Sequence, residues 1–346
     1  CGFELFNFIG WKAANLAEIE RLTEGKYVPP WFVVTDKTFN ELLETSIVEI
    51  KGDNGNQIAQ EISLREAINK ILKSDDLNNH QKSLQIRGLW EHAQIPEAIG
   101  KVIIEAYKNI IVEPIENQKS GKVVHNVYVA VRSSSREEDT EAAARAGEFE
   151  TYLYIHGEEQ LLHYLKLTWS GLWTERAIQY RSVIGIEFSQ TGGGVIVQQI
   201  VNARVSGVLQ TVDIPTGNLR EMVINAVLGM GEGIVSGTVA ADQITVSKET
   251  DLENEPLRFS YITSDKTEQI VFNRRSGYGT IRSQTLYHQR LRPALEYVEL
   301  NQLVNVAASL EKVYGYPLDI EFGIEESRIW ILQVRPVSLF LSVLNE

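Results

Sequence analysis

Polar residues near the C-terminus recur at every second position, the spacing that gathers side chains on one face of a β-strand. Asp319 and Glu321 alternate with apolar residues, and so do Gln333 and Arg335 further along the chain. If these segments form a hairpin with a loop at residues 326–328, antiparallel pairing sets Glu321 opposite Gln333 and Asp319 opposite Arg335, with Cβ atoms about 5 Å apart. We therefore expect these four polar side chains to share one patch.

Such a patch could bind a metal ion together with phosphate. Carboxylate and carboxamide oxygens suit Mg²⁺, which usually takes one or two protein ligands and completes its coordination with nucleotide phosphates. An arginine beside them supplies a fork for phosphate oxygens. The other face of the hairpin is expected to carry Ile320, Phe322, Leu332 and Val334. An ordinary half-exposed hairpin with a solvated, ion-paired face shows the same alternation, so the pattern alone leaves both interpretations open.

A second polar cluster follows a short apolar run at residues 127–131, which predicts a strand. Arg132 and the three serines at 133–135 would place a cation and several donors at the end of this strand. The small-residue run at 142–147 ends in Gly147, and Ala and Gly let backbone N–H groups approach phosphates closely. This run predicts either a lid over a phosphate site or a short Ala-rich helix.

Two further segments carry weaker signals. The glycine-rich stretch at 228–237 lacks the terminal Lys-Ser/Thr of a P-loop, and Ile234 occupies the position where a dinucleotide-binding fold needs Gly or Ala, so neither of those motifs is present. Lys12 lies at the start of a helix predicted from about residue 12 to 22, where a cation opposes the helix dipole. It indicates either an anionic ligand or an ordinary surface lysine.

Composition limits the class of protein. The chain has 346 residues, 43% of them hydrophobic, and a net charge of −13. This length predicts two lobes or a domain with subdomains. The acidic balance excludes a basic surface for nucleic acid or anionic membrane, so any bound phosphate needs a local cluster of donors.

Cysteine usage and hydropathy bear on location. The one cysteine, Cys1, permits no intrachain disulfide and no multi-cysteine metal site, which suits the cytoplasm. A cysteine at position 1 could be a lipidation site, but a trimmed or partial chain is the simpler explanation. No run approaches a membrane helix of about 18 apolar residues, and no signal-peptide layout is present.

The elements that position these residues change in character along the chain. We expect an extended stretch at 28–35, a helix with Asp36 as its N-cap, and helical patterns over 46–120. A long amphipathic helix is predicted over 158–181. Short strands follow at 195–201, 207–211 and 222–226, so we place the boundary between two lobes at 187/188, giving lobes of residues 1–187 and 188–346.

The order and spacing of these segments resemble the ATP-binding domain of phosphoenolpyruvate synthase, pyruvate phosphate dikinase and rifampin phosphotransferase. The match covers about residues 9 to 337 and joins many short motifs. These are the segments at 10–16, 28–35, 131–134, 138–139, 146–147, 151–153, 176–178, 180–181, 197–198, 207–209, 228–232, 235–237, 319–321 and 333–336, together with Val201. The resemblance implies an α+β fold of the ATP-grasp kind, in which two lobes hold ATP between them.

The resemblance also assigns roles to individual residues. Lys12 and Arg132 would bind phosphates, Arg335 would contact the phosphates being transferred, and these three would be catalytic. Glu321 and Gln333 would hold Mg²⁺. The remaining nucleotide-binding residues are Gly147 in the loop over the phosphates, Thr151, Asp319, and Gln198, Gln199, Ile200 and Val201 in the strand against adenine.

The implied reaction is phosphoryl transfer from Mg·ATP. The acceptor would be a histidine on a swivelling carrier domain, followed by a small molecule held by an acceptor domain, in the same or a separate chain. Two alternatives stay open: a stand-alone ATP-grasp kinase or ligase, and a non-catalytic nucleotide-binding module. The sequence departs from the family at Trp11, Arg145, Glu148, Gln210 and Val212. Gln210 stands where the family usually has a phenylalanine, and Val212 matters most, because it replaces an arginine.

Overall fold

The computed structural model describes residues 5–50, 60–110, 127–135, 151–188, 191–235, 237–249 and 255–337. The chain forms two compact units, and each is described by itself. Unit 1 contains residues 1–14 and 30–200, and unit 2 contains residues 15–29 and 201–346. The helix α1, Phe6–Leu22, contributes to both units.

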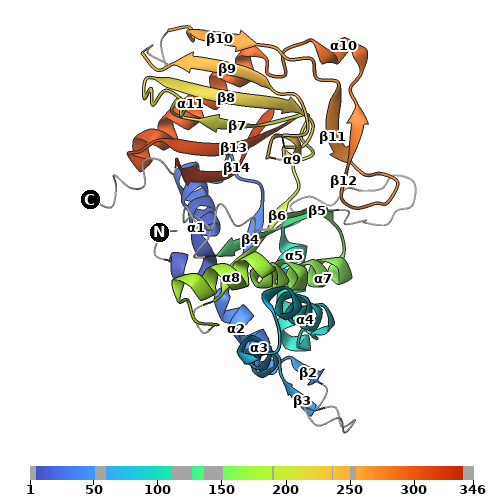
Figure 1. Cartoon of the computed structure of the whole chain (residues 1–346). Coiled ribbons are helices and arrows are strands. Elements are labelled where there is room, and N and C mark those ends of the chain that lie inside the picture. Colours follow the sequence, from blue (N-terminus) through green and yellow to red (C-terminus); the bar gives the residue numbers. More distant parts are fainter. Residues whose placement is uncertain are drawn as a thin grey trace. The chain divides into compact units, whose positions relative to one another are not determined.

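Unit 1 is built on a four-stranded antiparallel sheet in the order β1-β6-β4-β5, of which β4, β5 and β6 are labelled in Figure 1. Its strands are β1 Trp31–Val34, β2 Ile47–Ile50, β3 Gln60–Ser63, β4 Val129–Ser135, β5 Thr151–Ile155 and β6 Gly193–Gln199, of which β2 and β3 pair as a separate hairpin. Its other helices are α2 Asp36–Thr45, α3 Leu64–Lys73, α4 Asn79–His92, α5 Glu97–Asn109, α7 Glu158–Ser170 and α8 Glu175–Ile184, with the 3-10 turn η2 Gly171–Trp173.

Aromatic residues hold the helices of unit 1 against its sheet. Phe39 of α2, Trp90 of α4 and Trp169 of α7 are almost fully buried, and their ring centroids lie 5.5 to 5.9 Å apart. The Trp169 indole N–H donates to the carbonyl of Gly193 in β6 at 3.3 Å. Large buried aromatic groups of this kind contribute much of the hydrophobic stabilisation of a domain.

Two helix predictions in unit 1 need correction. The predicted helix at 158–181 is interrupted at η2, and Thr174 then caps α8 by accepting from the N–H of Ala177. A threonine at the N-cap satisfies a helix-terminal N–H, so the chain restarts a helix there instead of continuing one. Asp36 is the first residue of α2, and the N-cap is Thr35.

Unit 2 is built on a six-stranded antiparallel sheet in the order β10-β9-β8-β7-β13-β14 (Figure 1). Its strands are β7 Val205–Gln210, β8 Glu221–Leu228, β9 Asp242–Ser247, β10 Phe259–Ile262, β13 Leu318–Glu325 and β14 Arg328–Pro336, with β11 Glu268–Phe272 and β12 Thr280–Gln284 as a separate hairpin. Its helices are α9 Glu232–Val235, α10 Tyr287–Arg290 and α11 Tyr297–Tyr314.

Helix α11 covers one face of this sheet. Residues directly opposite one another in neighbouring strands share a face, and the register links Phe322, Gly207, Ala226 and Asp242 in one such row. The Asp242 carboxylate accepts from the N–H of Ala294, just before α11, at 2.8 Å. The helix therefore lies on the Phe322 face, and the side chains of Asp319 and Glu321 belong to the other face.

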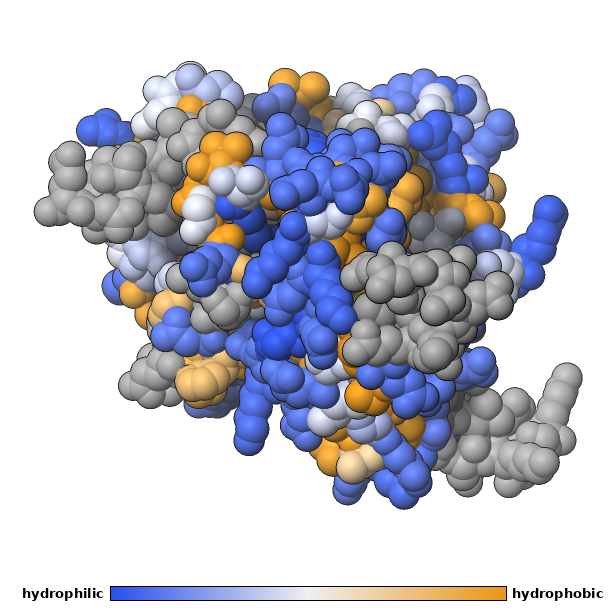
Figure 2. All heavy atoms as spheres, turned by 60° about the horizontal axis from the view of Figure 1, so that its bottom comes forward, coloured by the Kyte–Doolittle hydropathy of each residue, from blue (hydrophilic) through white to orange (hydrophobic). Residues whose placement is uncertain are grey.

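The observed division of the chain differs from the single expected break at 187/188. The second unit begins at Val201, after β6, and it also takes residues 15–29 from the N-terminal region. None of the helices in the described ranges combines the length and the apolar character needed to cross a bilayer. Hydrophilic residues predominate on the face shown in Figure 2, where apolar residues occur in small groups.

Candidate functional site

The hairpin of β13 and β14 pairs the predicted polar residues as expected. Glu321 lies opposite Gln333, and Asp319 lies opposite Arg335. These four residues, hereafter the polar row, come from the two strands at one edge of the six-stranded sheet. Asp319 and Gln333 are buried, Glu321 is half-buried and Arg335 is exposed.

The turn that joins the two strands is shorter than predicted. Glu325 pairs with Arg328, so the loop contains only two residues, and a register shift follows between Glu321 and Phe322. Phe322 therefore lies opposite Ile331, and Leu332 is the extra residue of a bulge. The short turn and the bulge cancel, which is why the pairing of the polar row still agrees with the prediction.

The bulge also corrects the position of Leu332. Ile331, fully buried, takes the expected place beside Phe322. A Cβ added at Gly323 would meet the side chains of Val201 at 3.3 Å and Leu332 at 3.6 Å, so these two side chains lie on the Gly323 face. This is the face of the polar row, and Val201, predicted to contact adenine, therefore packs beside it.

Asp319 and Arg335 form an ion pair within the polar row. The Arg335 Nε donates to Asp319 Oδ2 at 2.9 Å, and a terminal guanidinium nitrogen approaches the same oxygen at 2.8 Å. Burial raises the pKa of Asp319 above its ordinary value, while Arg335 acts to lower it and Glu321 to raise it further. The net shift is upward, so desolvation outweighs the arginine.

A residue that was noted in the sequence only as a departure from the family joins this group. Gln210 at the end of β7 lies opposite Asp319 on the side away from Arg335. Its amide makes a smaller contribution that lowers the pKa of Asp319. A line of three polar residues thus crosses three adjacent strands: Gln210, Asp319 and Arg335. The sequence signal for Gln210 was a polar residue at a position where the family has an aromatic one.

The donor set of the polar row suits Mg²⁺. Glu321 and Gln333 offer carboxylate and amide oxygens across one strand pair, and Oδ1 of Asp319 is buried without a hydrogen-bond partner in the described ranges. An orphaned buried carboxylate oxygen is unfavourable unless a cation or donor reaches it. Within the same ranges no cluster of three His, Cys, Asp or Glu side chains forms a complete protein cage. Two oxygen donors such as Glu321 and Gln333 suit Mg²⁺, which keeps several positions for phosphates and water.

In unit 1 a glycine sets the start of the helix that carries Lys12. Gly10 has φ 78°, and regular helix resumes after it, so Lys12 lies in the first turn as predicted. A Cβ at Gly10 would lie 2.0 Å from the carbonyl oxygen of Ser134. The N–H of Ala13 donates to Ser134 Oγ at 3.0 Å. The beginning of this helix is therefore held against the end of β4.

Strand β4 extends further than the sequence indicated. Arg132 and the serines at 133–135 lie within the strand, and the three serines are buried. Arg132, half-buried, pairs with Thr151 of β5 and with Ile196 of β6. Arg132, predicted to bind phosphate, and Thr151, predicted to bind the nucleotide, are thus direct neighbours across the sheet.

The segment predicted to contact adenine is the end of β6 and the residues after it. Gln198 is buried, and its Nε2 has no hydrogen-bond partner in the described part of the chain. The N–H groups of Gln199 and Ile200 donate to the carbonyls of Pro30 and Tyr128 at 2.8 and 2.9 Å. The backbone here is held rigidly, and the carbonyls of Gln199 and Ile200 can accept a hydrogen bond.

The glycine-rich stretch has a structural explanation. Gly229 has φ 79°, and a Cβ there would lie 2.2 Å from the carbonyl oxygen of Ile270 in β11. The N–H of Met230 donates to that same carbonyl at 2.9 Å. The glycine thus allows β8 to approach the β11–β12 hairpin closely. Gly147, predicted to lie over phosphates, is outside the described residues.

The predicted residues therefore divide between the two units. The polar row and Val201 belong to unit 2, where the structure brings them together. The others that lie in described ranges belong to unit 1: Lys12, Arg132, Thr151, Gln198, Gln199 and Ile200. Nothing in the sequence pattern indicated the contact between Gly10 and Ser134, which holds the start of the Lys12 helix against β4.

Comparison with known proteins identifies similar chains. The sequence is 31% identical over 368 residues to a probable phosphoenolpyruvate synthase of Pyrococcus horikoshii, covering 98% of this chain and 42% of that protein. It is 32% identical over 361 residues to the phosphoenolpyruvate synthase of Pyrococcus furiosus, covering 95% and 42%. A probable phosphoenolpyruvate synthase of Methanocaldococcus jannaschii is 32% identical over 337 residues, covering 95% and 25%. The chain thus spans less than half the length of these relatives.

A family match covers nearly the whole chain. Residues 6–341 match the family described as pyruvate phosphate dikinase, AMP/ATP-binding domain. The two units of mixed helix and sheet agree with this match, and the expected fold class, α+β of the ATP-grasp kind, is confirmed. The chain belongs to the pyruvate phosphate dikinase AMP/ATP-binding domain family.

Proposed function

We propose that this chain binds Mg·ATP and supplies the nucleotide half of a phosphotransferase reaction. The observation that carries the proposal is the polar row, which joins two oxygen donors for Mg²⁺ to an arginine on one strand pair. Family membership supports the nucleotide, and the relatives' names support transfer of phosphate.

In this proposal the two units contribute different groups. In unit 2, Glu321 and Gln333 hold Mg²⁺ and Arg335 contacts the phosphates. In unit 1, Lys12 and Arg132 neutralise phosphate charge. Bound Mg²⁺ would offset negative charge on the phosphates and orient them.

The remaining residues position the nucleotide. Thr151, beside Arg132, offers a hydroxyl to phosphate, and the carbonyls of Gln199 and Ile200 can accept from the adenine amino group. Gln198 orients this strand, and Val201 packs against the base beside the polar row. Catalysis then rests on positioning and charge neutralisation, as is general for phosphoryl transfer.

The phosphoryl acceptor in this proposal is a histidine on a carrier domain, in the same or a separate chain, and a small molecule receives the group afterwards. The relatives' greater length is consistent with further domains. A histidine within this chain is a poor carrier, because a carrier must travel between two sites. We expect no phosphohistidine when the chain alone is incubated with Mg·ATP. Label mapped to the exposed His288 would favour direct transfer within the chain.

Calorimetry tests the metal assignment. ATP is titrated into the chain with Mg²⁺ and with a chelator, and we expect tight binding only with Mg²⁺. Glu321→Gln, which removes one charge, should lose most of the Mg²⁺ dependence. Glu326→Gln, an exposed carboxylate in the turn of the same hairpin, is the matched control and should bind as the unmodified chain does. Equal affinity with and without Mg²⁺ would contradict the proposal.

A further inference from the structure

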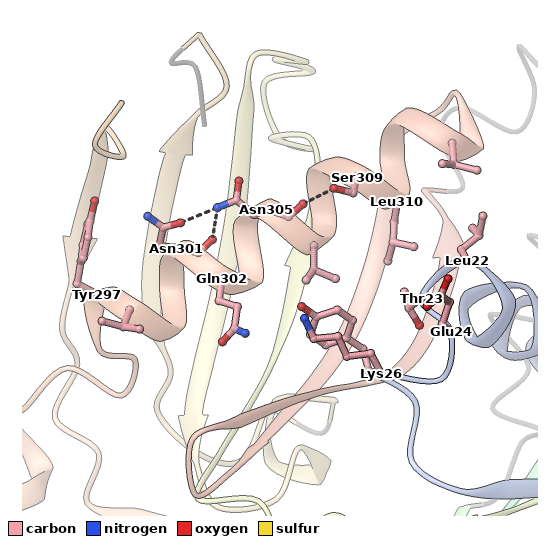
Figure 3. A pocket seen from close by; sticks show the side chains of 14 residues that line it. Leu22, Thr23, Glu24, Lys26, Tyr297, Asn301, Gln302, Asn305, Ser309 and Leu310 are labelled. Atoms are coloured by element: carbon pink, nitrogen blue, oxygen red, sulfur yellow. Dashed lines mark hydrogen bonds between the residues drawn. The ribbon is translucent and has the colours of Figure 1, made fainter. Parts of the chain in front are cut away.

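Unit 2 contains a cavity that the proposed ATP site does not use. It has a volume of about 820 Å³ and lies between α11 and the turn at residues 22–27 (Figure 3). Both walls belong to unit 2, so its shape is defined within one compact unit. Cavities that bind small molecules usually fall between about 300 and 1,000 Å³.

Apolar side chains form much of the cavity. Val306 and Leu310 of α11 are 8% and 2% exposed, and Leu22 lines the opposite wall. Val298 and Val313, exposed apolar residues near the two ends of α11, also line it. This surface would gain free energy by burying an apolar ligand of matching length.

The polar groups that α11 adds to the cavity are uncharged. Asn305 Nδ2 donates to the side chain and the carbonyl of Asn301 at 2.6 and 3.0 Å, and Ser309 Oγ donates to the carbonyl of Asn305 at 2.8 Å (Figure 3). Gln302 is exposed and points away from the helix into the cavity (Figure 3). No carboxylate of α11 lines the cavity, although the chain carries 46 acidic residues.

One cation and one acid come from the opposite wall. Figure 3 shows Lys26 directed below the middle of α11, and Glu24 beside Leu22 near the C-terminal part of that helix. Lys26 Nζ lies 5.0 Å from the centre of the Tyr27 ring, and it makes no ion pair with the described residues. The lysine therefore offers its charge to the cavity.

The turn that presents Lys26 is fixed to the sheet. Gly25 takes φ 71°, which a turn of this shape requires. The carbonyl of Lys26 accepts from Arg328 at 3.2 Å, and the carbonyl of Tyr27 accepts from the N–H of Ile331 at 2.7 Å. The cation and the apolar wall are thus held in a set geometry before any ligand binds.

We infer that this cavity binds a free small molecule with one anionic head and an apolar body, such as a medium-chain carboxylate. The head would pair with Lys26 and accept from the Gln302 amide, and the body would lie along Val306 and Leu310. The anionic head would lie on the Lys26 and Gln302 side of the cavity, away from Glu24, which lies beside Leu22. A cationic head at that position would be repelled by Lys26. A triphosphate would need more than one cation, so this ligand class differs from the nucleotide of the proposed function.

The test uses the fluorescent probe anilinonaphthalene sulfonate, which has an anionic head and an aromatic body. The folded chain should bind it at one saturable site. Ser309→Trp starts from an exposed position and fills the cavity without disturbing the core, so it should abolish binding. Lys26→Met should weaken binding about fivefold, the effect of losing one exposed ionic contact. Lys101→Met, an exposed lysine of unit 1 paired with Glu97, is the control and should have no effect.

Head-group chemistry is tested by competition. Dodecanoate should displace the probe at a concentration at least about fivefold lower than dodecanol does. Equal displacement by the two, or unchanged probe binding in both cavity variants, would overturn the inference. ATP affinity is measured in the same variants, whose substitutions lie outside the polar row. Loss of probe binding with unchanged ATP affinity supports the inference, and its failure leaves the proposed function untouched.

Discussion

Removing the Arg335 side chain tests whether this arginine acts on the nucleotide or only on its neighbour. Its side chain is 49% exposed, while the Asp319 side chain that it contacts is 11% exposed. Arg335→Ala therefore removes a half-solvated cation and leaves a mostly buried carboxylate without its donor. Two effects follow, one on stability and one on ATP binding, and they differ in origin.

The contacts of Arg335 set the size of both effects, the loss of stability and the loss of ATP affinity. An ion pair with one exposed partner contributes about 0–1 kcal/mol after solvent screening. Leaving the buried Asp319 oxygen unsatisfied adds about 1–3 kcal/mol, so we expect the free energy of unfolding to fall by about 1–4 kcal/mol in total. A lost charge-assisted contact to phosphate costs about 1.5–3 kcal/mol, which raises the Kd for Mg·ATP roughly 10- to 150-fold.

A second substitution separates these effects. In an Asp319→Asn background no ion pair exists, so removing Arg335 should change stability little. It should still weaken Mg·ATP binding by about tenfold or more if the arginine contacts phosphate. Urea denaturation followed by tryptophan fluorescence gives the stability, and calorimetry gives the affinity. Arg328→Ala is the matched control, because it removes an exposed arginine of the same strand that is not part of the polar row. The Arg328 Cζ lies 3.6 Å from the centre of the Trp330 ring.

Two results would show that Arg335 does not contact phosphate. If Arg335→Ala weakens Mg·ATP binding only when Asp319 is intact, the arginine acts by positioning that carboxylate and not by contacting phosphate. A drop in affinity of the same size for Arg328→Ala would instead indicate a general electrostatic effect of the hairpin.

Three further changes probe separate parts of the structure. Gly10→Ala places a methyl group 2.0 Å from a carbonyl oxygen of β4 at a positive φ, and thermal or urea unfolding should show a loss of about 2–4 kcal/mol. Burial raises the pKa of the Tyr261 hydroxyl, so near pH 10 this group ionises only in unfolded chains. The free energy of unfolding should therefore hold below that pH and fall above it, and it should fall less steeply in Tyr261→Phe. Gln210→Phe restores the aromatic residue usual in the family and removes the amide beside Asp319, so calorimetry should show Mg·ATP affinity about three- to tenfold weaker, whereas an unchanged Kd would exclude Gln210 from the site.

Strand alternation and hairpin pairing were the parts of the site most accessible from sequence. The partners in the polar row depend only on residues within a short stretch, so a period of two and a turn suffice to predict them. The predicted three-residue turn was wrong, because Glu325 pairs with Arg328 and leaves a loop of two residues. The bulge at Leu332 shifts the register by one residue and so restores the predicted pairing of the polar row. A bulge has no reliable signature in a single sequence, since it changes pairing without changing residue types.

Features that depend on distant contacts were not predictable in this way. The break in the helix expected over 158–181 is different, because its cap is local: Thr174 accepts from the N–H of Ala177 and starts α8, while the apolar periodicity continues across the break. Residues 15–29 join unit 2 because their partners, such as Ile331 for Tyr27, lie some 300 positions away. The role of Gly10 likewise depends on Ser134, which local pattern cannot identify.

The burial of Val212 bears on the loss of the arginine that the family has at this position. Val212 is fully buried, so an arginine placed at its present position would bury a guanidinium, at considerable cost unless it is paired. The departure is therefore built into the packing of unit 2, and Arg335 is left as the cation of the polar row. If the proposed function holds, more of the phosphate charge must be offset by Mg²⁺ and by Lys12 and Arg132 of unit 1. ATP binding by this chain should then depend on Mg²⁺ more steeply than in relatives that keep the arginine.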